Sequence, residues 1–276
     1  MKKRFIDGGI FNSNNYGPFK IIKQITMIDN PKEIYYQIEF VNSGCRIFAS
    51  SSAIAGGRVR DYLAPTVAGV GYIGSDIKVT SDFIFDFYKS WNDIINRCYN
   101  KYDDDYKYYG AIGVKVSSRW LNFTNFYYDA MLPPGYDKKI KFPSVYQLDK
   151  DYLQIKIPKN KRIYSPETCM WLSKYDNVMI MGLDKGTVSG YYGVYFIDNC
   201  WKTVIYNTTY GSFDIPEAAA NIYNFYTIQF KNKTPFHDII VLNDVEYMDY
   251  DSLIVHTIKN RKQRWLNDYP KGVESK

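Results

Sequence analysis

Two carboxylates flank a lysine where a short apolar run ends, at Asp149, Lys150 and Asp151, and Asn160 and Asn177 follow further along the chain. Carboxylate and amide oxygens are donors that Mg²⁺ accepts, and a bound Mg²⁺ can neutralise the charge that develops as a phosphodiester is cleaved. A lone Asp at a strand end or a lone Asn in a helix is equally common as a cap or turn residue. The residues alone leave both roles open.

Lys150 restricts the acid–base chemistry available at this position. A lysine side chain in water is almost wholly charged at neutral pH, and neighbouring carboxylates favour that charge. A charged ammonium can bind phosphate but cannot accept a proton. The chain's histidines, His237 and His256, lie near the C-terminus and are interpreted as structural or surface residues.

Basic residues gather near the C-terminus on a predicted final helix, at Lys259, Arg261, Lys262 and Arg264. Such a face could contact DNA phosphates without reading sequence, and it is about as often only a solvated surface. The formal net charge of +6 suits a polyanionic partner but is also ordinary for a protein of this length. Charge alone therefore assigns no function.

The composition predicts a folded protein of two or three small domains. A chain of 276 residues exceeds one average domain, and 46% hydrophobic residues can form several cores. The 28 tyrosines and 16 phenylalanines are interpreted mainly as core residues. Four widely spaced cysteines predict reduced, mostly buried thiols, and no apolar run has the length of a membrane span. We expect a cytoplasmic protein without a membrane partner.

Short β-rich runs separated by turn signals predict a small β-rich domain over residues 1–78. Its predicted strands cover residues 19–27, 34–40 and 45–49. Residues 79–182 begin with a helix from Asp82 behind a Ser81 cap and contain a second helical stripe from residue 120 to residue 130.

The same central region ends in a strand, a loop, a second strand and a helix. We expect the first strand at residues 145–149, the second at 169–172 and the helix from Ser173. This order is the one that a ββα unit requires.

A third predicted region, residues 187–230, contains three short strands followed by a helix. Asp214 and Glu217 form a capping box around Pro216, which predicts the start of that helix. Residues 231–276 carry an acidic segment and then the basic helix. The whole chain is predicted to be an α+β protein.

Short sequence motifs in the central region resemble those of phage-encoded HNH homing endonucleases. They are Trp-x-x-Ile-x-x-Arg-Cys-Tyr from Trp91, Trp-Leu-x-Phe-x-Asn-Phe from Trp120, Leu-Asp-Lys-Asp from Leu148 and Tyr-Ser-Pro-Glu-Thr-Cys from Tyr164. Residues 193–224 resemble a DNA-binding domain of the APETALA/ethylene-response-factor type.

The resemblance implies a central ββα domain of the His-Me finger type. In that family one divalent metal lies between an acidic residue and an Asn or His, and Asp149 and Asn177 match these positions. A histidine normally activates water, and Lys150 stands in its place. Asn160 matches the loop asparagine that steadies the histidine. The implied catalytic residues are Asp149, Lys150 and Asn160, and the implied metal is Mg²⁺ or Mn²⁺.

The second resemblance implies that a three-stranded sheet enters the major groove of double-stranded DNA. The residues that would face DNA are Tyr191, Tyr195, Trp201, Lys202 and Thr203. Residues 190–213 contain no arginine, so strong guanine readout is not expected. A core role for Trp201 is an open alternative, whereas Lys202 is expected to point outward.

The resulting hypothesis is a phage-encoded DNA endonuclease that acts in the cytoplasm of an infected bacterial cell. The missing histidine motivates a rival: an inactive DNA-binding or scaffold protein with a phage protein partner. A third alternative is a protein-interaction module that reuses the same surfaces. The DNA target, the type of cut and the oligomeric state remain open.

Overall fold

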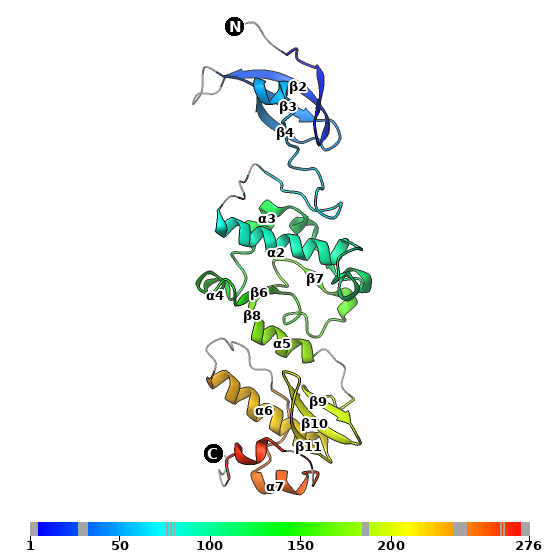
Figure 1. Ribbon diagram of the computed structural model, residues 1–276, viewed down its shortest axis with the longest axis vertical. Coiled ribbons are helices and arrows are strands. Elements are labelled where there is room, and N and C mark those ends of the chain that lie inside the picture. Colours follow the sequence, from blue (N-terminus) through cyan, green and yellow to red (C-terminus); the bar gives the residue numbers. More distant parts are fainter. Residues whose placement is uncertain are drawn as a thin grey trace. The chain divides into compact units, whose positions relative to one another are not determined.

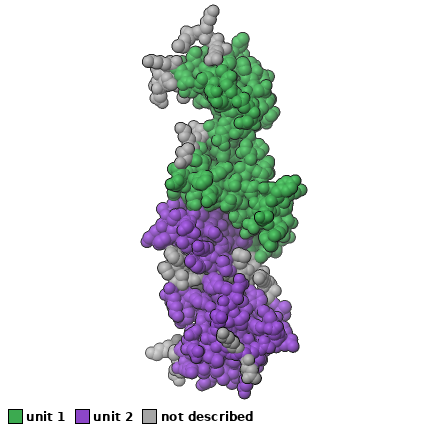
Figure 2. All heavy atoms as spheres, in the orientation of Figure 1, with its two compact units in different colours: residues 1–132, 157–168 green, residues 133–156, 169–276 purple. Residues whose placement is uncertain are grey.

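A computed structural model describes residues 5–26, 33–75, 77, 79, 81–183, 188–233, 242–259, 261 and 263–271. The chain forms two compact units that alternate along the sequence (Figures 1 and 2). One unit contains Met1–Leu132 and Ile157–Thr168, and the other contains Pro133–Lys156 and Cys169–Lys276. The α+β class is confirmed, and the four sequential regions expected above stay a prediction. None of the described helices is long and apolar enough to cross a membrane.

The N-terminal part is a four-stranded antiparallel sheet in the order β1-β2-β3-β4. The strands are β1 (Ile10–Ser13), β2 (Gly17–Thr26), β3 (Ile34–Phe40) and β4 (Arg46–Ser50). Alternate side chains of β3, namely Tyr36, Ile38 and Phe40, are fully buried, because one face of the sheet covers a core. Helix α1 (Ser51–Ala55) follows, and the Ser50 hydroxyl accepts a hydrogen bond from the Ala53 N–H at its start. The predicted β-rich character is confirmed, with β1 as an additional strand.

Helix α2 (Asp82–Tyr99) begins behind Ser81 as the sequence predicts, and its apolar stripe is buried. Ser118–Leu121 forms the 3₁₀ turn η3, and helix α3 (Phe123–Asp129) starts at an Asn122 cap. The second predicted helical stripe is thus divided in two. Tyr106–Tyr108 (η1), Gly110–Ile112 (η2) and Lys159–Lys161 (η4) are further 3₁₀ turns, and strand β5 (Lys115–Val116) pairs in parallel with β7 (Ile163–Tyr164).

The expected strand–loop–strand–helix order is present, with both strands and the helix in the second unit and the loop residues Ile157–Thr168 in the first. Helix α4 (Tyr136–Lys141) precedes β6 (Tyr146–Asp149), which pairs antiparallel with β8 (Met170–Ser173). Helix α5 (Lys174–Leu183) continues directly from β8. Asp149 lies opposite Met170, so it stands at the far end of this hairpin from the start of the helix.

The C-terminal part is a three-stranded antiparallel sheet packed on one long helix. Strands β9 (Val194–Ile197), β10 (Cys200–Ile205) and β11 (Thr208–Phe213) lie in the order β11-β10-β9. Both hairpins have two-residue turns with positive φ, a geometry that matches the twist of paired strands. Helix α6 (Pro216–Lys233) covers one face, with Ile222, Tyr223 and Tyr226 in the core as predicted. Helix α7 (Tyr250–Val255) and the 3₁₀ turn η5 (Trp265–Asn267) follow.

Candidate functional site

Asp149 is a buried carboxylate that organises the turn after β6. Its Oδ1 accepts hydrogen bonds from the backbone N–H groups of Asp151 at 2.9 Å and Tyr152 at 2.8 Å. The residue is only 3% exposed, and burial raises its pKa to about 6 against these stabilising hydrogen bonds. Asp149 therefore acts as a turn residue, one of the two roles that the sequence left open.

Lys150 is also buried, at 4% exposure, and its ammonium is held by Asp151. Nζ donates to Oδ1 of Asp151 at 2.6 Å and to Oδ2 at 2.8 Å. The Lys150 carbonyl oxygen accepts a hydrogen bond from the Gln154 side chain at 2.7 Å. Hydrogen bonds therefore hold both the side chain and the backbone of Lys150 within this loop. An ammonium bound to a carboxylate has no lone pair with which to accept a proton from water.

The two asparagines of the predicted site occupy different elements. Asn160 is exposed in η4 and belongs to the first unit, whereas Asp149 belongs to the second. Asn177 is half-buried in the first turns of α5. The donor types of Asp149 and Asn177 fit Mg²⁺. Within the described residues, however, no group of three His, Cys, Asp or Glu side chains is arranged to hold a metal.

The C-terminal sheet has one face toward α6 and one outward face. The Thr203 hydroxyl donates to the Ala219 carbonyl at 2.6 Å and is fully buried, so Thr203 faces the helix and not a DNA partner. Trp201 packs on the same side against the core, as its alternative interpretation allowed, and Tyr191 also packs against this core. Lys202 lies between Trp201 and Thr203 on β10, so its side chain points to the opposite, outward face. Tyr195 is the partner of Lys202 on β9 and therefore shares that outward face.

The segment after α7 runs beside β11 and is not the predicted basic helix. The Ile258 N–H donates to the Ser212 carbonyl at 3.0 Å, and the Arg264 N–H donates to the Tyr210 carbonyl at 3.1 Å. The Gln263 side chain accepts from the Ser212 N–H at 3.0 Å and donates to the Ser212 carbonyl at 3.2 Å. These bonds to a neighbouring strand replace the bonds within a helix, which explains why the helical expectation for Lys259, Arg261 and Arg264 is wrong. Lys262 lies outside the described residues.

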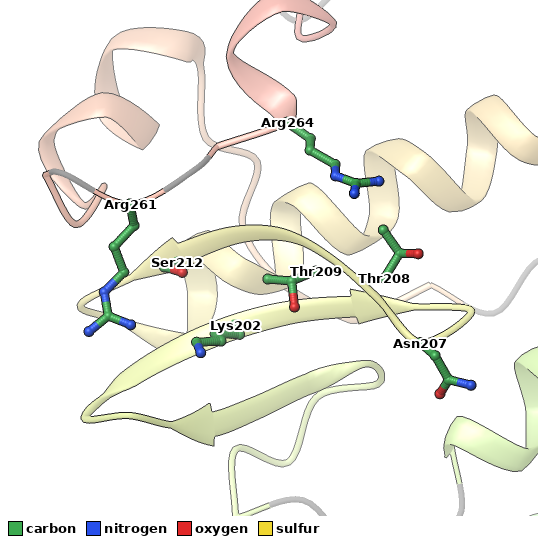
Figure 3. Close-up of a pocket in the computed structure, with 7 residues that line it drawn as sticks. All are labelled: Lys202, Asn207, Thr208, Thr209, Ser212, Arg261 and Arg264. Carbon is green, nitrogen blue, oxygen red and sulfur yellow. The ribbon is translucent and has the colours of Figure 1, made fainter.

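Docking of this segment creates a hollow of about 590 Å³ at the outward face (Figure 3). Lys202 lines it from β10, whereas Arg261 and Arg264 line it from the C-terminal segment, on opposite sides of the view in Figure 3. Its other lining residues carry hydroxyl or amide groups and are Asn207, Thr208, Thr209 and Ser212. We call these seven residues the cationic hollow. The arrangement is suited to an anion because three positive charges and several neutral donors line one open space.

Asp198, in the turn between β9 and β10, supplies a negative charge beside the cationic hollow. Its Oδ2 accepts a hydrogen bond from Lys202 Nζ at 2.6 Å and lies 3.9 Å from Arg261 Nη1. The hydrogen bond from Lys202 holds the pKa of Asp198 below its ordinary value. Sequence reasoning missed Asp198 and Gln263, although the spacing of four residues between Asp198 and Lys202 across a tight turn was a usable signal.

Comparisons with protein-family models, curated proteins and solved structures found no match. Any functional conclusion therefore depends on the residues and their geometry.

Proposed function

We propose that this chain binds double-stranded DNA through the outward face of its C-terminal sheet. The cationic hollow would then bind phosphates of the DNA backbone. The observation that carries the proposal is that Lys202, Arg261 and Arg264, which come from two separate segments, all line one space with several hydroxyl groups. Phosphate contacts of Lys and Arg provide essentially all of the affinity of non-specific DNA binding and a large share of that of specific binding. The hydroxyl groups of Thr208, Thr209 and Ser212 add donors for phosphate oxygens.

Shape supports a duplex as the partner. A two- or three-stranded antiparallel sheet can enter the major groove, which is about 12 Å wide. Tyr195 and Thr209 then face the groove from the strands, while the arginines reach the flanking backbone. Such contacts position the protein but carry little sequence information, which agrees with a sheet that has no arginine of its own.

Binding of a duplex over a series of salt concentrations tests the proposal. We expect Arg264→Ala to weaken binding and to lower the slope of log affinity against log salt by about 1, because one phosphate contact is lost. Lys231→Ala is the matched control, since it removes an exposed cation from α6. A wild-type protein that binds no duplex at low salt, or an Arg264 variant that behaves like the control, would overturn the proposal.

A second candidate function, endonuclease activity, is favoured by the ββα order with a buried carboxylate at the end of β6. Asp149 and Asn177 are the residues that would hold Mg²⁺ or Mn²⁺, which when bound would neutralise charge at the scissile phosphate. Asp149 would hold it through the oxygen that the backbone does not already use. Lys150, engaged by Asp151, would contribute positive charge and not proton abstraction.

Incubation of the protein with phage and bacterial DNA in Mg²⁺ or Mn²⁺, followed by mapping of the ends, tests this second function. Site-specific cuts that Asp149→Ala abolishes would support an endonuclease without a histidine. Intact DNA that the protein still binds would instead support a DNA-binding or scaffold protein, the alternative favoured by the buried Lys150–Asp151 pair.

A further inference from the structure

Two of the three cations of the hollow are already in contact with an anion of the protein itself. Lys202 Nζ lies 2.6 Å from Asp198 Oδ2, and Arg261 Nη2 donates to the Asp198 carbonyl oxygen at 3.2 Å. The Lys202 side chain is only 15% exposed although it stands on the outward face, whereas that of Asp198 is 65% exposed. One exposed carboxylate thus faces two of the three positive charges that line the hollow.

A carboxylate and a phosphodiester are chemically interchangeable for these cations. Each carries one negative charge and offers oxygen acceptors to ammonium and guanidinium groups. An ion pair with a largely exposed carboxylate adds little to stability, because water competes for that carboxylate. The contact is therefore weak enough for a phosphate to replace it.

We infer that in the unbound protein the Asp198 carboxylate makes the contacts with Lys202 and Arg261 that a DNA phosphate makes in the complex. When DNA binds, the phosphodiester replaces Asp198 as the partner of these two cations. This inference rests on the proposed function and adds to it the residue that limits affinity. The Asp198 carboxylate opposes every phosphate that enters the cationic hollow. Among the described residues Asp198 pairs with Lys202 and Arg261, whereas the Cζ atom of Arg264 lies 5.9 Å from the centre of the Tyr210 ring, so Arg264 is the cation available to the first phosphate.

The turn geometry offers a variant that removes the charge and keeps the fold. Asp198 and Asn199 have φ values of 52° and 56°, a conformation that Asn adopts readily. Asp198→Asn therefore preserves the turn, and Asp198→Gly is a second variant that tolerates the same backbone. Asp244→Asn is the control, because it makes the same change of net charge at another exposed position.

Fluorescence anisotropy with one labelled duplex, at several salt concentrations, distinguishes the outcomes. We expect Asp198→Asn to tighten binding about two- to fivefold, the range of a surface ion pair, and Asp244→Asn to change it less. The gain should shrink when Arg261→Ala is added, since the pair then lacks one partner.

Failure of the inference and failure of the proposed function give different results. If the wild-type protein binds no duplex at low salt, the proposed function is lost and the inference with it. If the wild-type protein binds but Asp198→Asn and Asp198→Gly bind no more tightly than Asp244→Asn, only the inference is overturned.

Discussion

Two lysine–aspartate pairs with the same 2.6 Å separation stand in very different surroundings. In the turn after β6 the side chains of Lys150 and Asp151 are 5% and 22% exposed, whereas beside β10 those of Lys202 and Asp198 are 15% and 65% exposed. Removal of a buried ammonium withdraws a positive charge from its carboxylate where little water can replace it, whereas water or a ligand can replace the partner of an exposed carboxylate. Burial therefore separates a structural pair from one that can bind.

The largest expected difference between the pairs is in stability. Lys150→Met should lower the free energy of unfolding by about 3 kcal/mol, because it leaves the Asp151 carboxylate without its ammonium. Lys202→Met should change it by less than about 1 kcal/mol but should weaken DNA binding. Urea unfolding of both variants, together with duplex affinity, measures the contrast. Equal losses of stability would show that burial does not distinguish the two pairs.

Asp149, next to the buried Lys150, should make the stability of the protein depend on pH. Its pKa of about 6 in the folded protein exceeds the ordinary 3.8, so the folded state binds a proton that the unfolded chain releases. The stability from this group is fully present below about pH 4 and is lost as pH rises through about 6. A gap of about two pH units corresponds to about 3 kcal/mol.

Asp149→Asn retains an oxygen for the two backbone N–H groups and removes the charge. We expect the variant to be more stable than the wild type at pH 8 and to lack the decline between pH 4 and pH 6. Urea unfolding across this range measures the effect, with the exposed Asp104→Asn as control. A wild-type decline that persists unchanged in Asp149→Asn would assign the titration to another group.

The smallest effect is expected for Gln263, which positions the arginines and does not itself line the cationic hollow. Gln263→Ala removes two hydrogen bonds to Ser212, worth about 1–2 kcal/mol together. We expect faster amide exchange at Ser212 and a loss of DNA affinity of up to about tenfold, as Arg261 and Arg264 lose their support. Gln24→Ala, on an exposed position of β2, is the control. Unchanged affinity would show that the backbone bonds of Ile258 and Arg264 suffice.

Much of the fold could be predicted because it depends on local periodicity. The buried stripe of α2, the strands around Tyr36 and the β6–β8–α5 order all follow from the spacing of apolar residues and from caps. The C-terminal basic segment could not be predicted, since its hydrogen bonds go to β11, a strand about fifty residues earlier. Propensity is a weak guide where a distant strand supplies the partners.

The candidate site likewise contains residues that could be placed from the sequence and residues that could not. Lys202 could be placed on the outward face from the alternation of its strand, whereas Thr203 needed the structure to show that its hydroxyl meets α6. By itself the sequence determined which charges exist and which elements carry them, because side-chain chemistry and periodicity are local properties. Tertiary structure decided which charges meet, since burial and the docking of the C-terminal segment depend on contacts between distant residues. The same two residue types therefore form a mostly buried pair at Lys150 and a more exposed pair at Lys202, where we propose that DNA binds.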